Sequence, residues 1–197
     1  MLFLFEIKNN DSKINMYKGR KYIMKKVLQF AGLISLVLAA VAFVLMMATP
    51  AVSYTVSSSS TVNFAGTLAI FGGELDAAQI LLLLTDKAKP ATLALLAWIF
   101  ILVGMIIVLL GVVLPLFKVK AIEKFAGLLN LCALVLFVIA GIFMFTVRAG
   151  FFSAQGFKDV PEKAAIGFGW VFGGILSIAA GAFAILPAAA NFFGKKK

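Results

Sequence analysis

Carboxylates are the first residues to consider for chemistry, and five of them lie in the two polar stretches between long apolar blocks. They are Glu74, Asp76, Asp86, Asp159 and Glu162. Paired carboxylates can act as general acid and base or bind a divalent cation. Three of them are explained more simply as helix caps, because Asp76 precedes Gln79, and Asp159 precedes Glu162, at the spacing of a capping box. Five basic residues share the two stretches and neutralise the set: Lys87, Lys89, Arg148, Lys158 and Lys163. We therefore expect no catalytic, cofactor-binding or metal-binding residues.

The missing residue types narrow the enzyme classes further. The chain has no histidine, which excludes imidazole-ligated haem, histidine-containing zinc sites and histidine acid/base catalysis. Its single cysteine, Cys132, has no partner for a disulfide or a Cys-x-x-Cys pair. Neither a Walker-type phosphate loop nor a nucleophile elbow is present. The sequence predicts that the protein is not an enzyme.

Polar side chains within the apolar blocks are few. Asn130 and Ser177 are the two that we expect well inside the membrane, and an interhelical hydrogen bond is the preferred interpretation of both. The functional alternative is that Asn130 makes an intramembrane polar contact in a cavity for a neutral ligand. No charged residue lies inside the four blocks, which counts against ion-coupled transport and proton relays.

The elements that carry these residues are predicted by hydrophobicity. Of the 197 residues, 63% are hydrophobic, and the mean hydropathy is +1.09. Four apolar blocks predict membrane spans at about 27–49, 91–117, 125–147 and 164–193, each near the roughly 20 residues that a spanning helix needs. The predicted fold is an all-α integral membrane protein, a four-helix bundle over 24–197 with loops at 50–90 and 148–163.

The first block allows two interpretations. The uncharged run from Val27 to Thr49 follows Lys25 and Lys26 and ends before Pro50. Small residues after the run would suit a cleavable secretory signal, but its length far exceeds the roughly 7 to 15 residues of a signal core. We favour a retained helix.

Residues 1–23 differ from the rest because they are polar and rich in lysine. Lys18-Gly19-Arg20-Lys21 can be encoded by a purine run that includes a ribosome-binding sequence just upstream of Met24, so a start assigned too early is one interpretation. The other is a genuine basic tail that lies on the anionic inner leaflet.

The two loops have local patterns of their own. Val52–Val56 and Thr61–Phe71 predict a small β-hairpin, and Ala77–Thr85 a short helix that lies on the membrane or packs on the bundle. Arg148 and Gly150 are expected to end the third helix, and Pro187 to kink the fourth. Three phenylalanines of the second loop are expected to reach the lipid headgroups or a partner: Phe151, Phe152 and Phe157.

Lysine distribution predicts the orientation. The side of the termini has eight lysines and one acidic residue, Glu123, which gives a net charge of +7. The other side has five acidic and five basic residues, so its net charge is zero. The eight topology-setting residues are Lys25, Lys26, Lys118, Lys120, Lys124, Lys195, Lys196 and Lys197. Positive charge is retained in the cytoplasm, so both termini are expected inside the plasma membrane. Trp98 and Trp170, both near the outer interface, agree with this. The formal charge of +10 thus reflects topology and not a nucleic-acid partner.

Small residues are expected to bring the helices together. The fourth block carries one at every fourth position: Ala165, Gly169, Gly173, Ser177 and Gly181. Similar residues recur in the first three blocks: Gly32, Ser35, Ala39, Ala42, Ala97, Gly104, Gly111, Ala126, Ala133 and Ala140. Packing within one chain accounts for them, and a homo-oligomer through the fourth helix is the alternative.

The layout of four spans, with both ends inside and a long first outer loop containing strands, resembles that of claudin-like tetraspan proteins. The resemblance covers layout alone, because residues 51–90 contain neither the tryptophan motif nor the cysteine pair of that family. The leading hypothesis is a small bacterial tetraspan protein with a structural or accessory role, which meets lipid or another membrane protein through its fourth helix or outer loop. The alternative is a subunit of an oligomeric transporter or channel for a neutral or lipid-like solute.

Overall fold

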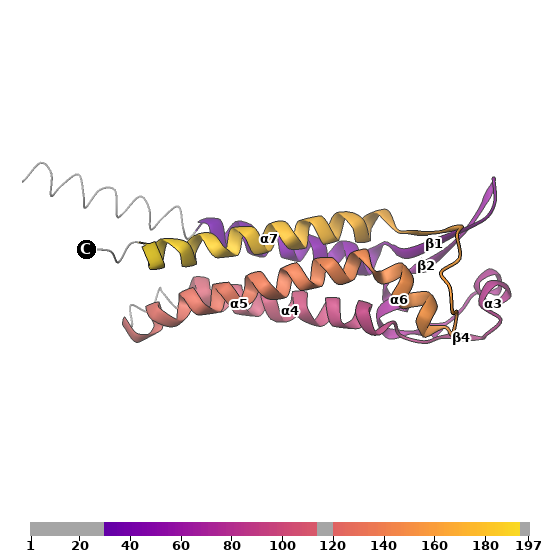
Figure 1. Cartoon of the computed structure of the whole chain (residues 1–197), viewed down its shortest axis with the longest axis horizontal. Helices are drawn as coiled ribbons and strands as arrows, with labels where there is room; N and C mark the ends of the chain where they lie inside the picture. Colours follow the sequence, from indigo (N-terminus) through magenta and orange to yellow (C-terminus); the bar gives the residue numbers. More distant parts are fainter. Residues whose placement is uncertain (1–29, 114–119, 194–197) are drawn as a thin grey trace, which may run out of the picture.

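The computed structural model describes residues 30–113 and 120–193. It contains four helices long and apolar enough to cross a membrane: a first helix over Phe30–Ala48, then α4 (Thr92–Val113), α5 (Lys120–Phe145) and α7 (Phe168–Phe193). The four helices run side by side, and a small sheet with short helices caps one end of them (Figure 1). We call this end the sheet end. The arrangement is that of a multi-pass membrane protein.

The helix boundaries correct several expectations. The helix α5 begins at Lys120, so Lys120 and Lys124 lie in its first turns and not in a turn before it. It ends at Phe145, and Arg148 and Gly150 belong to a separate helix, α6 (Val147–Ala154), instead of capping α5. The chain around Asp159 and Glu162 begins no helix. It leads into strand β5 (Ala164–Ile166), and α7 starts only at Phe168 and continues past Pro187.

Both loops contribute to the sheet, whereas the sequence predicted strands in the first loop alone. Strand β1 (Pro50–Ser57) pairs antiparallel with β2 (Ser60–Ala65) on one side and with β5 on the other. The predicted hairpin is present, but its second strand ends at Ala65. The rest of the predicted strand forms helix α2 (Gly66–Phe71). A second sheet pairs two short strands, β3 (Gly73–Glu74) and β4 (Lys87–Ala88).

The helix α3 (Ala77–Leu83) forms where the capping signal predicts it. Asp76 accepts a hydrogen bond from the backbone N–H of Gln79 at 2.8 Å, and the Gln79 side chain accepts one from the N–H of Asp76 at 3.0 Å. Its position differs from the expectation, because α3 contacts β2 at the far side of the sheet end and not the bundle (Figure 1). Leu83 is buried there, whereas Leu81 and Leu84 are exposed.

One core runs from the sheet into the bundle without a break. Phe64 of β2 packs against Phe151 and Phe152 of α6, with ring centroids 4.9 and 6.4 Å apart. Trp170 of α7 and Met46 of the first helix belong to the same buried cluster. Phe151 and Phe152 are therefore core residues and do not reach headgroups or a partner, which corrects the sequence-based expectation.

Within the bundle, away from the sheet end, glycines set the spacing of the helices. A Cβ on Gly104 would lie 2.6 Å from the ring of Phe137, and one on Gly141 would lie 2.8 Å from the carbonyl oxygen of Gly174. Helices in lipid gain little from burying leucine, so close backbone approach is what they require. The small residues predicted in the first three helices are buried wherever side chains are described: Gly32, Ser35, Ala39, Ala42, Ala97, Gly104, Gly111, Ala133 and Ala140.

Candidate interaction surface at the sheet end

The sheet is an extension of two membrane helices. Thr49 alone separates the first helix from β1, and Gly167 alone separates β5 from α7. The backbone N–H of Gly167 donates to the carbonyl oxygen of Ala51 at 2.9 Å, and the N–H of Gly66 donates to that of Thr49 at 2.9 Å. The orientation of β1 and β5 is thereby tied to the packing of the helices that carry them.

Three glycines make this junction sterically feasible. A Cβ on Gly167 would overlap the carbonyl oxygen of Pro50, and one on Gly66 would overlap that of Met46. Gly169 lies against the Thr49 side chain, whose hydroxyl donates to the carbonyl oxygen of Leu45 at 2.7 Å. Two of these contacts are with backbone atoms, so this close approach requires glycine at positions 66 and 167.

Two glutamine side chains fasten the loops of the sheet end to this framework. Gln79 of α3 donates through Nε2 to the carbonyl oxygen of Asn63 at 2.7 Å, which covers part of the β2 edge. Gln155 donates through Nε2 to the carbonyl oxygen of Lys89 at 2.8 Å and accepts from the N–H of Lys89 at 3.0 Å. The second contact joins residues that are 66 positions apart in the chain. Neither of these contacts was predicted from the sequence, because a hydrogen bond from a glutamine side chain to a distant backbone group leaves no local pattern.

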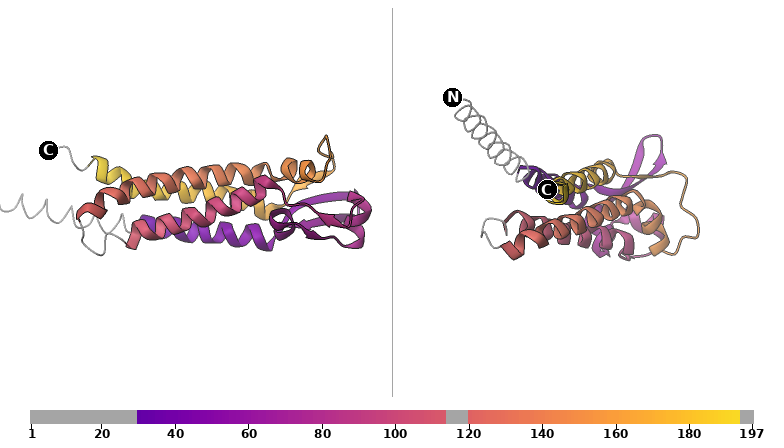
Figure 2. Two further views of the ribbon diagram at one scale, coloured as in Figure 1. Left: turned by 90° about the horizontal axis from the view of Figure 1, so that it is seen from below. Right: turned by 60° about the vertical axis from the view of Figure 1, so that its left-hand side comes forward.

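The hairpin carries the most prominent exposed surface of the sheet end. Its tip stands away from the other segments in two views (Figures 1 and 2). Residues 55–61 are all exposed, and no charged residue occurs between Pro50 and Gly73. At the base of the hairpin, the Ser53 hydroxyl donates to Oδ1 of Asn63 at 2.8 Å, across the strands. The surface is therefore uncharged and rich in hydrogen-bonding groups.

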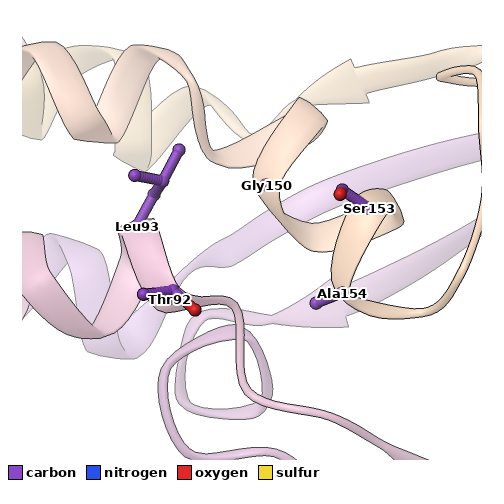
Figure 3. A pocket seen from close by; sticks show the side chains of 5 residues that line it. All are labelled: Thr92, Leu93, Gly150, Ser153 and Ala154. Atoms are coloured by element: carbon purple, nitrogen blue, oxygen red, sulfur yellow. The ribbon is translucent and has the colours of Figure 1, made fainter.

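A small hollow lies between the start of α4 and α6. Thr92 and Leu93 line it from α4, and Gly150, Ser153 and Ala154 line it from α6 (Figure 3). Its volume is about 220 Å³. The hydroxyl groups of Thr92 and Ser153 are on exposed residues, so the hollow is open and has no buried polar group that would select a ligand.

The five carboxylates from the sequence do not come together. Asp76 caps α3, Glu74 lies opposite Lys87 in the β3–β4 pair, and all five carboxylates are on exposed residues. Among the described residues, no group of three or more His, Cys, Asp or Glu side chains could hold a metal ion.

The small residues at every fourth position of α7 pack against other helices of the same chain. Gly173 lies against Met144 of α5 and the backbone of Ala42, and the Ser177 hydroxyl donates to the carbonyl oxygen of Phe137 at 2.8 Å. Gly181 lies 3.2 Å from the carbonyl oxygen of Leu134, measured from a built Cβ. Ala165 is not part of the helical stripe, because it lies on β5 and is exposed.

Other residues singled out in the sequence have separate positions. The amide of Asn130 is buried against α4, 2.6 Å from where a Cβ on Gly111 would lie. Ser35, at a small-residue position, donates to the carbonyl oxygen of Ala180 at 2.7 Å. Of the eight topology lysines, Lys120 and Lys124 lie at the end opposite the sheet, in the first turns of α5, and the other six are outside the described residues. Residues 1–23 also lie outside the described residues.

The tryptophans differ from the interface anchors expected from the sequence. Trp170 is fully buried in the protein, so its ring does not face lipid headgroups. Trp98 packs between Phe43 and Phe71, with centroids 6.0 and 5.3 Å away. The indole Nε1 atoms of both tryptophans are buried and make no hydrogen bond with the described residues. Only Trp98 keeps a partly exposed ring near the helix end.

The sequence matches no protein-family model and no curated protein.

Proposed function

We propose that this chain is a small bacterial integral membrane protein of the plasma membrane with a structural or accessory role. In this proposal both termini are cytoplasmic and the sheet end is outside, where it presents a rigid surface to another protein or to lipid. The observation that carries the proposal is the junction at Gly167 and Gly66, which makes the sheet a stiff extension of two spanning helices. A surface held in this way keeps its orientation to the membrane when it binds.

The junction also supports retention of the first helix. Cleavage before Tyr54 would cut β1, which is the central strand of the sheet, and would remove the Ser35 hydroxyl that bonds to α7. A bundle built around this helix would lose one of its four members. We therefore propose that residues 30–48 remain part of the working protein.

The alternative, a subunit of an oligomeric transporter or channel, requires a path for solute. The facing positions of the bundle are filled by fully buried side chains such as Phe137, Ile101 and Trp170. A path would therefore have to run between copies of the chain. The stripe from Gly169 to Gly181 is used within one chain, so copies would have to meet through lipid-side residues such as Phe172 and Ile175.

Site-specific photo-crosslinking in native cells tests the accessory role. A benzoylphenylalanine at Ser58, on the hairpin tip, is expected to give one adduct of defined mass that contains a protein or lipid. The same group at Val103, on the lipid side of α4, is the control and is expected to give bulk-lipid adducts alone. Equal adduct patterns at the two positions would contradict the proposal.

Reconstitution separates the two hypotheses. Liposomes containing the purified protein are expected to be no more permeable to glycerol than empty liposomes. Faster glycerol entry, together with an oligomeric mass in lipid nanodiscs, would favour the transporter alternative.

A further inference from the structure

The tip of the β1–β2 hairpin is rich in hydroxyl groups. Six of its seven residues are serine or threonine: Thr55, Ser57, Ser58, Ser59, Ser60 and Thr61. All seven residues are exposed, and the one apolar member, Val56, is 48% exposed. We call residues 57–61 the serine cluster.

Hairpin geometry explains only part of this composition, because serine is common in turns and threonine in strands, but neither preference accounts for Ser57 and Ser60 on the strands. Ser57 pairs with Ser60, so Ser58 and Ser59 form a two-residue turn. Such turns favour Asn-Gly or Asp-Gly because their central residues adopt positive φ. Leu84 is the one non-glycine residue with positive φ in the described part of the chain, so neither turn serine adopts this conformation. Serine is also not among the residues that strands favour.

The hydroxyl groups of the serine cluster are free for another role. The side-chain hydrogen bonds between described residues include Ser53 with Asn63 at the hairpin base, but none involves a hydroxyl of the cluster. The tip also stands apart from α3 and α6, so an enzyme can approach both faces of the hairpin (Figure 2). Alternate residues of a strand point to opposite faces, and the cluster therefore offers hydroxyls on both.

We infer that the serine cluster is a site of O-linked glycosylation, which takes a neutral sugar from a lipid-linked sugar phosphate. Segments rich in serine and threonine carry O-linked sugars in stalks that also contain proline. The serine cluster has the hydroxyl groups and the exposure of such segments but no proline. The hairpin itself contains no charged residue, which suits a neutral sugar. The inference rests on the proposed orientation, in which the hairpin lies outside the cytoplasm.

The transfer is a substitution at the anomeric carbon of the sugar. A serine Oγ attacks this carbon and forms the glycosidic C–O bond, while the bond from the anomeric carbon to the phosphate oxygen breaks. The lipid phosphate leaves with the electron pair, and the hydroxyl proton passes to a base of the transferase. The serine cluster can accept the added bulk, because all of its residues are exposed and none of them makes a hydrogen bond to another described segment of the sheet end.

Peptide mass spectrometry on protein from native membranes tests the inference. Chymotrypsin cleavage after Tyr54 and Phe64 releases residues 55–64 as one peptide. The expected mass of this peptide exceeds that of the unmodified chain by whole sugar units, and mild alkaline elimination removes the excess. An unmodified peptide would overturn the inference, as would a mass excess of phosphate.

Variants identify the acceptor groups. Replacing Ser57, Ser58, Ser59, Ser60 and Thr61 by alanine is expected to abolish the mass excess, whereas replacing the four serines by threonine retains it. Ser153→Ala, which removes an exposed hydroxyl from α6, is the control and leaves the mass excess unchanged. A mass excess that persists in the alanine variant would place the sugar elsewhere. If that variant does not accumulate, the wild-type peptide still decides the question.

A labelling arm distinguishes failure of the inference from failure of the proposed orientation. Lys87→Cys in a Cys132→Ser background places a thiol on an exposed residue of the same loop. Labelling by an impermeant reagent in intact cells, with an unmodified 55–64 peptide, would overturn the glycosylation while the orientation stands. Labelling only after permeabilisation would overturn both.

Discussion

The carbonyl oxygen of Pro50 lies where a side chain on Gly167 would have to begin, and the N–H of Gly167 donates to the next carbonyl oxygen, that of Ala51, at 2.9 Å. The two residues are 117 positions apart in the sequence. Pro50 lies where the first helix leads into β1, and Gly167 lies where β5 leads into α7. Within the described residues, these are the two places where a membrane helix and a strand of the larger sheet are directly connected. Glycine at this position lets the two backbones approach within hydrogen-bonding distance.

Gly167→Ala is expected to destabilise the protein by about 3 kcal/mol, because the added methyl group overlaps a backbone atom that cannot rotate away. Thermal unfolding in lipid nanodiscs measures the effect. Gly150→Ala is the control, since its Cβ would lie 3.4 Å from Leu93, in ordinary contact, and alanine favours the helix α6. Equal stability of the two variants would show that the junction tolerates movement.

Ser35→Ala and Ser177→Ala are each expected to lower the free energy of unfolding by about 0.6 kcal/mol. Each removes one hydrogen bond from a buried hydroxyl to a carbonyl oxygen of another helix, and such bonds are weak on average in membrane proteins. The loss in the double variant is expected to differ from the sum of about 1.2 kcal/mol, because Ser177 and Ala180, which accepts from Ser35, lie within one turn of α7. Steric trapping in lipid measures these changes, and a loss above about 1.7 kcal/mol for either single variant would require a further role for that serine.

Gln155→Leu is expected to free the loop around Lys89 from α6. The substitution removes both hydrogen bonds to the Lys89 backbone while keeping a similar side-chain volume. Hydrogen exchange of the Lys89 amide should accelerate about fivefold, which corresponds to about 1 kcal/mol for the lost bonds. Gln155→Glu, which keeps the acceptor but loses the donor, should give a smaller increase, and unchanged exchange in both variants would contradict the role of Gln155.

Leu84→Gly is expected to stabilise the sheet end by about 1 kcal/mol. Leu84 ends α3 in the left-handed conformation with φ of 55°, which strains a residue with a Cβ, and its side chain is 87% exposed, so little packing is lost. Leu81→Gly in the same helix is the matched control and should destabilise by a similar amount, because glycine disfavours a helix interior. The midpoint of thermal unfolding checks both signs.

The proposed orientation predicts which thiols react in intact cells. In a Cys132→Ser background, Ser153→Cys should react with an impermeant reagent, whereas Gly194→Cys should react only after permeabilisation. Replacing Lys118, Lys120 and Lys124 together removes about 3 kcal/mol of attraction to anionic lipid and should leave some chains misoriented. The reverse labelling pattern in the wild-type background would place the sheet end in the cytoplasm.

The sequence was sufficient to determine the four membrane helices and the start of α3. An uninterrupted apolar run must form a helix in lipid, where every backbone group needs an internal partner, so composition and length decide the outcome. Asp76 and Gln79 interact within one turn, and their spacing alone predicts the cap.

Tertiary structure decided the elements that depend on distant partners. Ala164–Ile166 resemble the start of a helix in the sequence, but β1 offers an unpaired edge and the segment becomes β5. Asp159 and Glu162 have the spacing of a helix cap, yet no helix begins beside them. The chain first crosses to the edge of β1, and α7 begins only after β5. The pairing of Gly167 with Ala51, and of Gln155 with Lys89, joins parts of the chain whose proximity arises only once four helices have packed, so no local pattern reports it.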